Sequence, residues 1–132
     1  MSQPRPSVVI INDNANTCVG LAELLELCGF EAHCAFSGAD GLYKVTARRP
    51  DAVLLDMNMP DMSGLVVCAA IRGRAIIANT AIVFHSGEQK PAELNGADAF
   101  LTYPVPLDIL SAVLHATIAK RRAIGLAQKE KT

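Results

Sequence analysis

The sequence predicts a three-layer α/β fold, in which helices cover both faces of a five-stranded parallel sheet. Short apolar segments of strand length alternate along the chain with segments in which apolar residues recur at helical spacing. No internal repeat and no low-complexity stretch interrupts this alternation. Such an alternation builds right-handed βαβ units, whose strands run parallel. We therefore expect a doubly wound sheet with the carboxyl ends of its strands along one edge.

Length and composition indicate one domain with a single core. The chain has 132 residues, of which 51% are hydrophobic. Its formal net charge of −1 indicates no general attraction to nucleic acid or to an anionic membrane. No apolar run approaches the roughly 18 residues of a membrane span, and the first six residues lack the apolar core of a signal peptide. We expect a flexible lead-in at 1–6, the domain at 7–122, and a C-terminal helix end or tail at 123–132.

The cysteines do not predict a metal site or a disulfide framework. Four are present without C-x-x-C spacing: Cys18, Cys28, Cys34 and Cys68. Three of them fall within apolar helix or strand patterns, where free cysteine is commonly a small buried hydrophobe. This usage fits a reducing, cytoplasmic compartment.

The first strand is predicted at Ser7–Asn12, because this segment is apolar and β-branched. Asn12, Asp13 and Asn14 follow it as polar residues that can cap a helix. The next apolar residues recur at i, i+3, i+4, i+7 and i+10, from Cys18 to Cys28, which indicates an amphipathic helix. Gly29 is then expected to end this helix in the position after its C-cap.

A weaker strand and a second helix follow. The strand is expected at Phe30–Phe36, and Ser37 is expected to cap the helix. Arg48 and Arg49 lie near the negative end of the helix dipole, and Pro50 terminates the helix.

The central segment runs from Asp51 to Gly64 and reads DAVLLDMNMPDMSG. Its short apolar run, 52–55, suits a strand that is covered on both faces. Asp56 stands where that run stops, and the carboxyl end of a strand is where open α/β sheets bind their ligands. The residues after it form a loop in which Pro60 and Gly64 mark the turns.

The remaining elements follow the same pattern. Ser63 begins a third helix that ends near Gly73, and strands are expected at Thr80–Ser86 and Asp98–Tyr103. A final helix begins at Leu107, and we expect it to fray through 120–122 into a charged tail. The interval between the last two strands is short. Only Glu88–Leu94 has room there for a helix of one or two turns, with Gly96 as its stop.

Four strand ends carry polar residues that the sheet would bring together. These are Asn12 with Asp13, Asp56, Ser86, and Tyr103 with Pro104. The turn after the first strand has no G-x-G-x-x-G or G-x-x-x-x-G-K-[ST] fingerprint. A flavin-binding protein of similar topology would need a phosphate-cradling loop there, and the carboxylate of Asp13 would repel the cofactor phosphate.

An apolar strand followed by DMNMPDMSG resembles the phosphoacceptor segment of receiver domains of two-component response regulators. The resemblance extends over about residues 7–122. It implies a flavodoxin-like sheet of strand order 2-1-3-4-5 with a shortened fourth helix. It also implies a cis bond between Tyr103 and Pro104.

The resemblance implies a role for each residue at the strand ends. Asp56 would accept a phosphoryl group from a histidine kinase or a phosphotransfer protein. Mg²⁺ would be held by Asp13, Asp56 and the backbone carbonyl of Asn58, with Asn12 a weaker ligand through water. Ser86 would contact the phosphoryl group. Phe100 would act with Ser86 as a conformational switch.

Two residues depart from the family pattern. Asn12 replaces the first of two acidic residues, and Tyr103 replaces a lysine. A phenol donates one hydrogen bond but carries no positive charge at neutral pH. The two changes offset each other electrostatically, since one negative and one positive group are lost together.

We therefore interpret the chain as a phosphoaccepting receiver, with at most self-phosphorylation and self-dephosphorylation activity. It would signal through a protein partner or a further domain, as a monomer or weak dimer, without contacting nucleic acid or membrane. The alternative is a pseudo-receiver that serves as an interaction module independently of phosphate.

Overall fold

The sheet has five parallel strands in the order β2-β1-β3-β4-β5, as the sequence and its resemblance predicted. The computed structural model describes residues 4–130. The strands are β1 Ser7–Ile11, β2 Glu31–Ala35, β3 Ala52–Leu55, β4 Ala81–Ser86 and β5 Ala99–Thr102. All residues of β3 and β4 are buried, which explains their continuous apolar runs.

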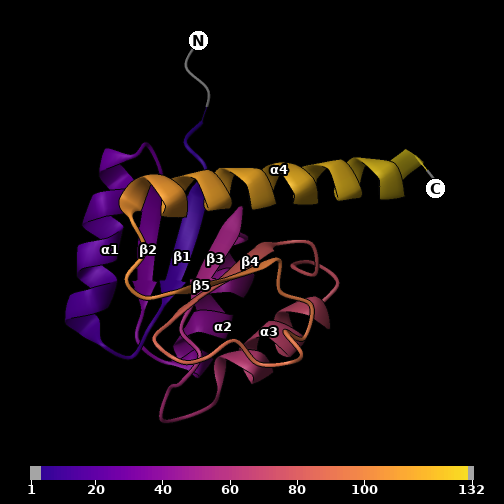
Figure 1. Cartoon of the computed structure of the whole chain (residues 1–132). Helices are drawn as coiled ribbons and strands as arrows, with labels where there is room; N and C mark the ends of the chain where they lie inside the picture. Colours follow the sequence, from indigo (N-terminus) through magenta and orange to yellow (C-terminus); the bar gives the residue numbers. More distant parts are fainter. Residues whose placement is uncertain (1–3, 131–132) are drawn as a thin grey trace.

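Two helices cover each face of the sheet (Figure 1). Helices α1 (Ala15–Leu27) and α4 (Leu107–Glu130) pack on one face, and α2 (Gly38–Arg48) and α3 (Gly64–Arg72) pack on the other. Successive residues of β1 contribute to the two cores in turn, because side chains alternate along a strand. Val8 and Ile10 face α1 and α4, whereas Val9 and Ile11 face α2 and α3.

Local side chains set the starts of three helices as predicted. Asn14, Ser37 and Ser63 occupy the N-caps of α1, α2 and α3, and each accepts a hydrogen bond from a backbone amide of the first turn. Gly29 follows the C-cap of α1 with φ of 90°, a conformation that glycine adopts without a steric cost.

The short helix expected at Glu88–Leu94 is absent, and residues 87–98 form a loop instead. Pro91 leaves too few residues before Gly96 for a stable helix, and both Asn95 and Gly96 have positive φ. Helix α3 supplies the contacts that hold the loop. The Cys68 thiol lies 3.5 Å and 3.3 Å from the carbonyl oxygens of Leu94 and Asn95, and Arg72 Nε donates to the Gly96 carbonyl at 2.9 Å.

Helix α4 is longer than the expected fraying at 120–122 allowed. It continues without interruption to Glu130, and its last turns extend beyond the sheet (Figure 1). Asn79 Nδ2 donates to the carbonyl oxygen of Arg121 at 2.6 Å, which supports the helix where it leaves the body of the domain. Good helix formers such as Ala123, Leu126 and Gln128 then carry it outward.

The N-terminal lead-in is only partly described. Residues 1–3 lie outside the described residues, whereas Arg5 and Pro6 contact the domain. Arg5 forms an ion pair with Glu26 at 2.7 Å, and the Pro6 carbonyl accepts from the Glu31 amide at 2.9 Å. Within residues 4–130, no helix has the length and apolarity needed to cross a membrane.

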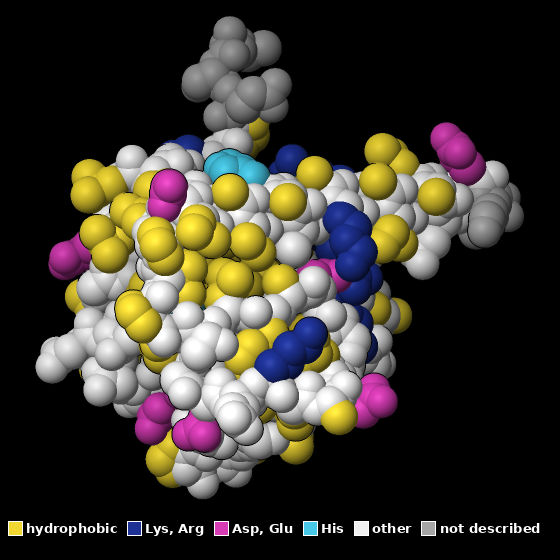
Figure 2. All heavy atoms as spheres, viewed as in Figure 1, with side chains coloured by type: hydrophobic (Ala, Val, Ile, Leu, Met, Phe, Trp, Pro, Cys, Tyr) yellow, Lys and Arg dark blue, Asp and Glu magenta, His cyan; other side chains and the backbone are white. Residues whose placement is uncertain are grey.

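One face of the molecule carries a broad hydrophobic area below the first half of α4 (Figure 2). On helix α4, Ile109 is 47% exposed, and Leu101, Val105 and Val113 are partly buried against the core that α4 covers. If copies of the chain associate weakly, as expected above, this surface offers apolar area on the last helix.

Candidate functional site

Asp56 lies immediately after β3, at the carboxyl edge of the sheet. Its amide donates to the Ile11 carbonyl at 2.9 Å, which continues the β1–β3 pairing by one residue. Its half-buried carboxylate accepts hydrogen bonds from the amides of Met57 and Asn58. Gly64 lets the loop return closely, because a Cβ atom there would collide with the Asp56 carbonyl oxygen.

Burial raises the pKa of Asp56 to about 6. The amides of Met57 and Asn58 oppose this shift, whereas the charge and the hydrogen bond of the neighbouring Asp13 carboxyl add to it. Asp13 follows β1 and is exposed. The structure therefore brings together the two carboxylates that the sequence placed at adjacent strand ends.

The donor set fits Mg²⁺. The described residues contain no cluster of three or more His, Cys, Asp or Glu side chains suited to a metal ion, so Asp13 and Asp56 stand as a pair. Burial is the main cause of the raised pKa of Asp56 and the Asp13 charge adds to it; a divalent cation would relieve the repulsion between the two carboxylates. Two carboxylates, a backbone carbonyl and several waters are a coordination sphere that Mg²⁺ accepts.

Ser86 ends β4 and is 1% exposed. Its Oγ accepts a hydrogen bond from the Glu88 amide at 3.1 Å, which leaves the hydroxyl hydrogen available to another acceptor. The amide of Tyr103 donates to the Ser86 carbonyl at 3.0 Å, so the ends of β4 and β5 lie side by side.

The two residues that depart from the family pattern are hydrogen-bonded to each other. Asn12 is 5% exposed, and its Nδ2 lies 3.2 Å from Tyr103 Oη. Asn12 Oδ1 accepts from the Asn14 amide at 2.9 Å and retains a second lone pair for a water. The sequence placed both residues at this edge but gave no signal that they touch.

Aromatic neighbours surround Tyr103 and Phe100. The His85 ring packs edge-on against Tyr103 at a centroid distance of 4.0 Å, and burial lowers the pKa of His85 to about 4. Within the described part of the chain, His85 Nδ1 has no hydrogen-bond partner. Phe100 is half-buried with its ring 5.9 Å from that of Phe84. The bond between Tyr103 and Pro104 is cis, as expected.

Asp61, in the loop after β3, ties the site to a helix, which sequence reasoning missed. Its carboxylate accepts from the amides of Gly38 and Ala39 at 3.0 Å and 2.9 Å, at the start of α2. These bonds hold the pKa of Asp61 below its usual range. The loop that carries Asn58 is thus fixed to an adjacent element.

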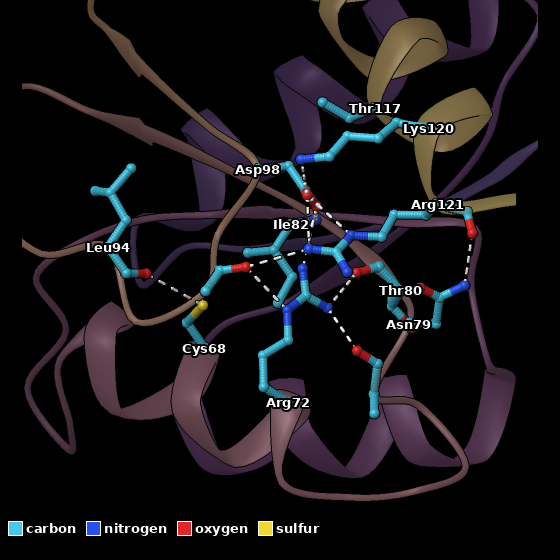
Figure 3. Close-up of polar contacts among 12 residues, drawn as sticks. Cys68, Arg72, Asn79, Thr80, Ile82, Leu94, Asp98, Thr117, Lys120 and Arg121 are labelled. Atoms are coloured by element: carbon cyan, nitrogen blue, oxygen red, sulfur yellow. Dashed lines mark hydrogen bonds and ion pairs between the residues drawn. The ribbon is translucent and has the colours of Figure 1, made fainter. Parts of the chain in front are cut away.

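A buried ionic cluster at the opposite edge of the sheet was also missed (Figure 3). The Asp98 side chain has no exposed area and pairs with Arg72, Lys120 and Arg121. Its Oδ2 also accepts from the Ile82 amide at 2.9 Å. Burial raises the pKa of Asp98, but the hydrogen bonds from Arg121, Ile82 and Lys120 outweigh it, so the pKa is lowered. This cluster joins α3, β5 and α4 far from Asp56.

Comparison with known proteins identifies relatives over almost the whole chain. The family model described as the response regulator receiver domain matches residues 8–115. Transcriptional regulatory protein PrrA of Mycobacterium leprae is 33% identical over 128 residues, which are 95% of this chain and 55% of that protein. Cell cycle transcriptional regulator CtrA of Caulobacter vibrioides is 32% identical over 126 residues, covering 92% and 53%. The chain thus spans about half the length of these relatives.

Solved structures agree on the fold. A sensor protein from Polaromonas sp. JS666 has a TM-score of 0.82 at 27% identity and covers 89% of this chain and 99% of its own. A response regulator receiver domain (CheY-like) from Methylobacillus flagellatus has a TM-score of 0.78 at 28% identity, covering 86% and 98%.

Proposed function

This chain belongs to the response regulator receiver domain family of two-component signal transduction, and we propose that Asp56 is its phosphoacceptor. One observation carries the proposal. The exposed Asp13 and the half-buried Asp56 interact at the carboxyl edge of the sheet, where burial raises the pKa of Asp56 to about 6. The two structural aspartates described above differ from Asp56, because Asp98 is paired with protein cations and Asp61 accepts backbone amides at the start of α2.

The proposed reaction is a transfer of a phosphoryl group from a phosphohistidine to Asp56. A carboxylate oxygen of Asp56 bonds to phosphorus as the P–N bond breaks, and the nitrogen of the donor imidazole keeps the electron pair. Such a transfer needs positioning and charge stabilisation more than covalent help from the protein. The amides of Met57 and Asn58 orient the attacking carboxylate. The hydroxyl groups of Ser86 and Tyr103 stand at the neighbouring strand ends to contact phosphoryl oxygens.

Mg²⁺ would be held by Asp13, Asp56 and the backbone carbonyl of Asn58, with Asn12 touching its water shell. When bound, the ion supplies charge screening between the carboxylates and the phosphoryl oxygens. Ser86 and Phe100 would report phosphorylation through a change of their own positions.

Receivers of this family work with histidine kinases or phosphotransfer proteins. For this chain the phosphoryl donor would be such a protein, and the signal would pass to a protein partner or a further domain. The replacement of an acid and a lysine by Asn12 and Tyr103 favours one alternative, a receiver fold that binds partners independently of phosphate.

Intact-mass analysis after incubation with acetyl phosphate tests the proposal. We expect a gain of one phosphoryl group in the presence of Mg²⁺, little gain in the presence of a chelator, and none in Asp56→Asn. Asp61→Asn is a matched control, because this carboxylate lies on the same loop but binds helix α2. No gain in the wild type, or an equal gain in Asp56→Asn, would refute the phosphoacceptor assignment.

A further inference from the structure

The hydrogen bonds of Asn12 fix which way its side-chain amide points. Oδ1 must face the Asn14 amide, because only the oxygen can accept that N–H at 2.9 Å. The Nδ2 group therefore faces Tyr103, and it donates to the phenol oxygen at 3.2 Å. A flipped amide would instead direct Nδ2 at the Asn14 N–H, where two donors would face each other.

This arrangement decides where the hydroxyl hydrogen of Tyr103 can go. The phenol oxygen already accepts from Asn12, so its own hydrogen is free to donate elsewhere. The His85 ring packs edge-on against the phenol ring and restricts its rotation. The Asp56 carboxylate is close enough to contribute to the raised pKa of Tyr103, after burial as the main cause and against the lowering effect of Asn12.

We propose that Asn12 and Tyr103 act as one unit, in which Asn12 directs the Tyr103 hydroxyl to donate to a phosphoryl oxygen on Asp56. Tyr103 contacts the phosphoryl group, and Asn12 is the positioning residue. The pair supplies a neutral donor at the place where an acid and a lysine would supply a charged one. This inference rests on the proposed phosphorylation of Asp56.

If the two residues act together, the isosteric substitution Asn12→Asp should remove the hydrogen bond that Tyr103 donates to the phosphoryl group. In Asn12→Asp, one oxygen still accepts from the Asn14 amide, but the other becomes an acceptor facing the phenol. The Tyr103 hydroxyl then donates to residue 12 and no longer toward Asp56. Asn12→Asp should therefore have the same effect as Tyr103→Phe, although it leaves the hydroxyl in place.

The effect is measured as the affinity of each protein for beryllofluoride, a phosphoryl mimic. This affinity is determined by ¹⁹F NMR. Each protein is measured at a Mg²⁺ concentration that saturates it, because the new carboxylate in Asn12→Asp also strengthens metal binding. We expect about tenfold weaker binding in both Asn12→Asp and Tyr103→Phe, the loss of one hydrogen bond to a charged group. The double variant Asn12→Asp/Tyr103→Lys, which restores an acid and a lysine, should regain affinity to within about threefold of the wild type.

Two controls separate the unit from general effects of the substitutions. Tyr43→Phe removes a hydroxyl from an exposed tyrosine, and Asn16→Asp adds a charge in the first turn of α1; both should bind as the wild type does. Wild-type affinity in Tyr103→Phe would show that the hydroxyl does not contact the phosphoryl group. Wild-type affinity in Asn12→Asp would show that residue 12 does not direct it.

Failure of the proposed function gives a different result. In that case the wild type itself neither binds beryllofluoride nor gains mass from acetyl phosphate. If one single variant does not fold, as judged by circular dichroism, the other still tests the unit, because each is predicted to lose the same donor.

Discussion

At the scale of single residues, the ionised carboxylate of Asp56 is destabilised in the metal-free fold. Burial raises its pKa to about 6 from 3.8, and the Asp13 carboxyl adds to the shift. The folded state thus binds the Asp56 proton more tightly than the unfolded state does. This contribution favours folding below about pH 4 and is lost as the pH rises through 6.

Asp56→Asn should therefore stabilise the metal-free protein at pH 7.5. The expected gain in the free energy of unfolding is about 1–3 kcal/mol, because a shift of one pKa unit corresponds to about 1.4 kcal/mol. The gain should nearly vanish at pH 4. Urea denaturation with chelator at both pH values measures it, and equal gains at the two pH values would contradict the electrostatic explanation.

Asp98 shows the opposite behaviour of a buried carboxylate. Its unexposed side chain is paired with three cations, and its pKa is lowered. Asp98→Asn would leave Arg72 and Arg121 partly buried without their counterion. We expect the free energy of unfolding to fall by about 3 kcal/mol.

Lys120→Ala is the matched control for that substitution, since 55% of the Lys120 side chain is exposed. Its cost should be at most about 1 kcal/mol. Chemical denaturation of both variants gives the comparison. Similar costs for the two would mean that the Asp98 cluster contributes no more than an ordinary surface ion pair.

At the scale of elements, the loop at residues 87–98 is the clearest departure from regular structure. In this described segment, the backbone N–H groups of residues 89–95 donate no hydrogen bond, whereas the Asn95 side chain donates to the Leu65 carbonyl at 3.0 Å. The loop is held mainly at its end, where Cys68 and Arg72 contact the carbonyl groups of residues 94–96. Its first half, next to Ser86, lacks such contacts.

Hydrogen exchange should show this difference directly. Amides of Glu88–Asn95 should exchange faster than those in the middle of α1 and α4, because few contacts oppose local opening. Exchange followed by NMR or mass spectrometry on the unmodified protein provides the measurement. Protection of Glu88–Asn95 equal to that of α1 would show that the loop is as stable as the helices.

At the scale of the whole molecule, the sequence predicted the layers well because each strand and helix carries its own signal. The apolar runs of β3 and β4, the caps Ser37 and Ser63, and the period of α1 are local patterns, and the structure confirms them. The strand order required the family resemblance, since parallel pairing joins residues far apart in sequence.

Contacts between distant elements could not be predicted in the same way. The Asn12–Tyr103 hydrogen bond joins the ends of β1 and β5. The ion pairs of Asp98 join α3 and α4. Neither the hydrogen bond nor the ion pairs can be predicted from the spacing of apolar residues within one element. The extension of α4 was missed because Lys120–Arg122 looks like a charged helix end. In the structure, Arg121 pairs with the buried Asp98, and the Arg121 carbonyl accepts a hydrogen bond from Asn79.

The central claim is that phosphoryl transfer occurs on Asp56, and chemical localisation of the modification tests it most directly. Borohydride reduces an aspartyl phosphate to homoserine, which tandem mass spectrometry of peptides can locate. After incubation with acetyl phosphate and Mg²⁺, we predict homoserine at residue 56 and unchanged Asp13 and Asp61. Homoserine at another aspartate, or an unmodified residue 56 in a protein that has gained mass, would contradict the account.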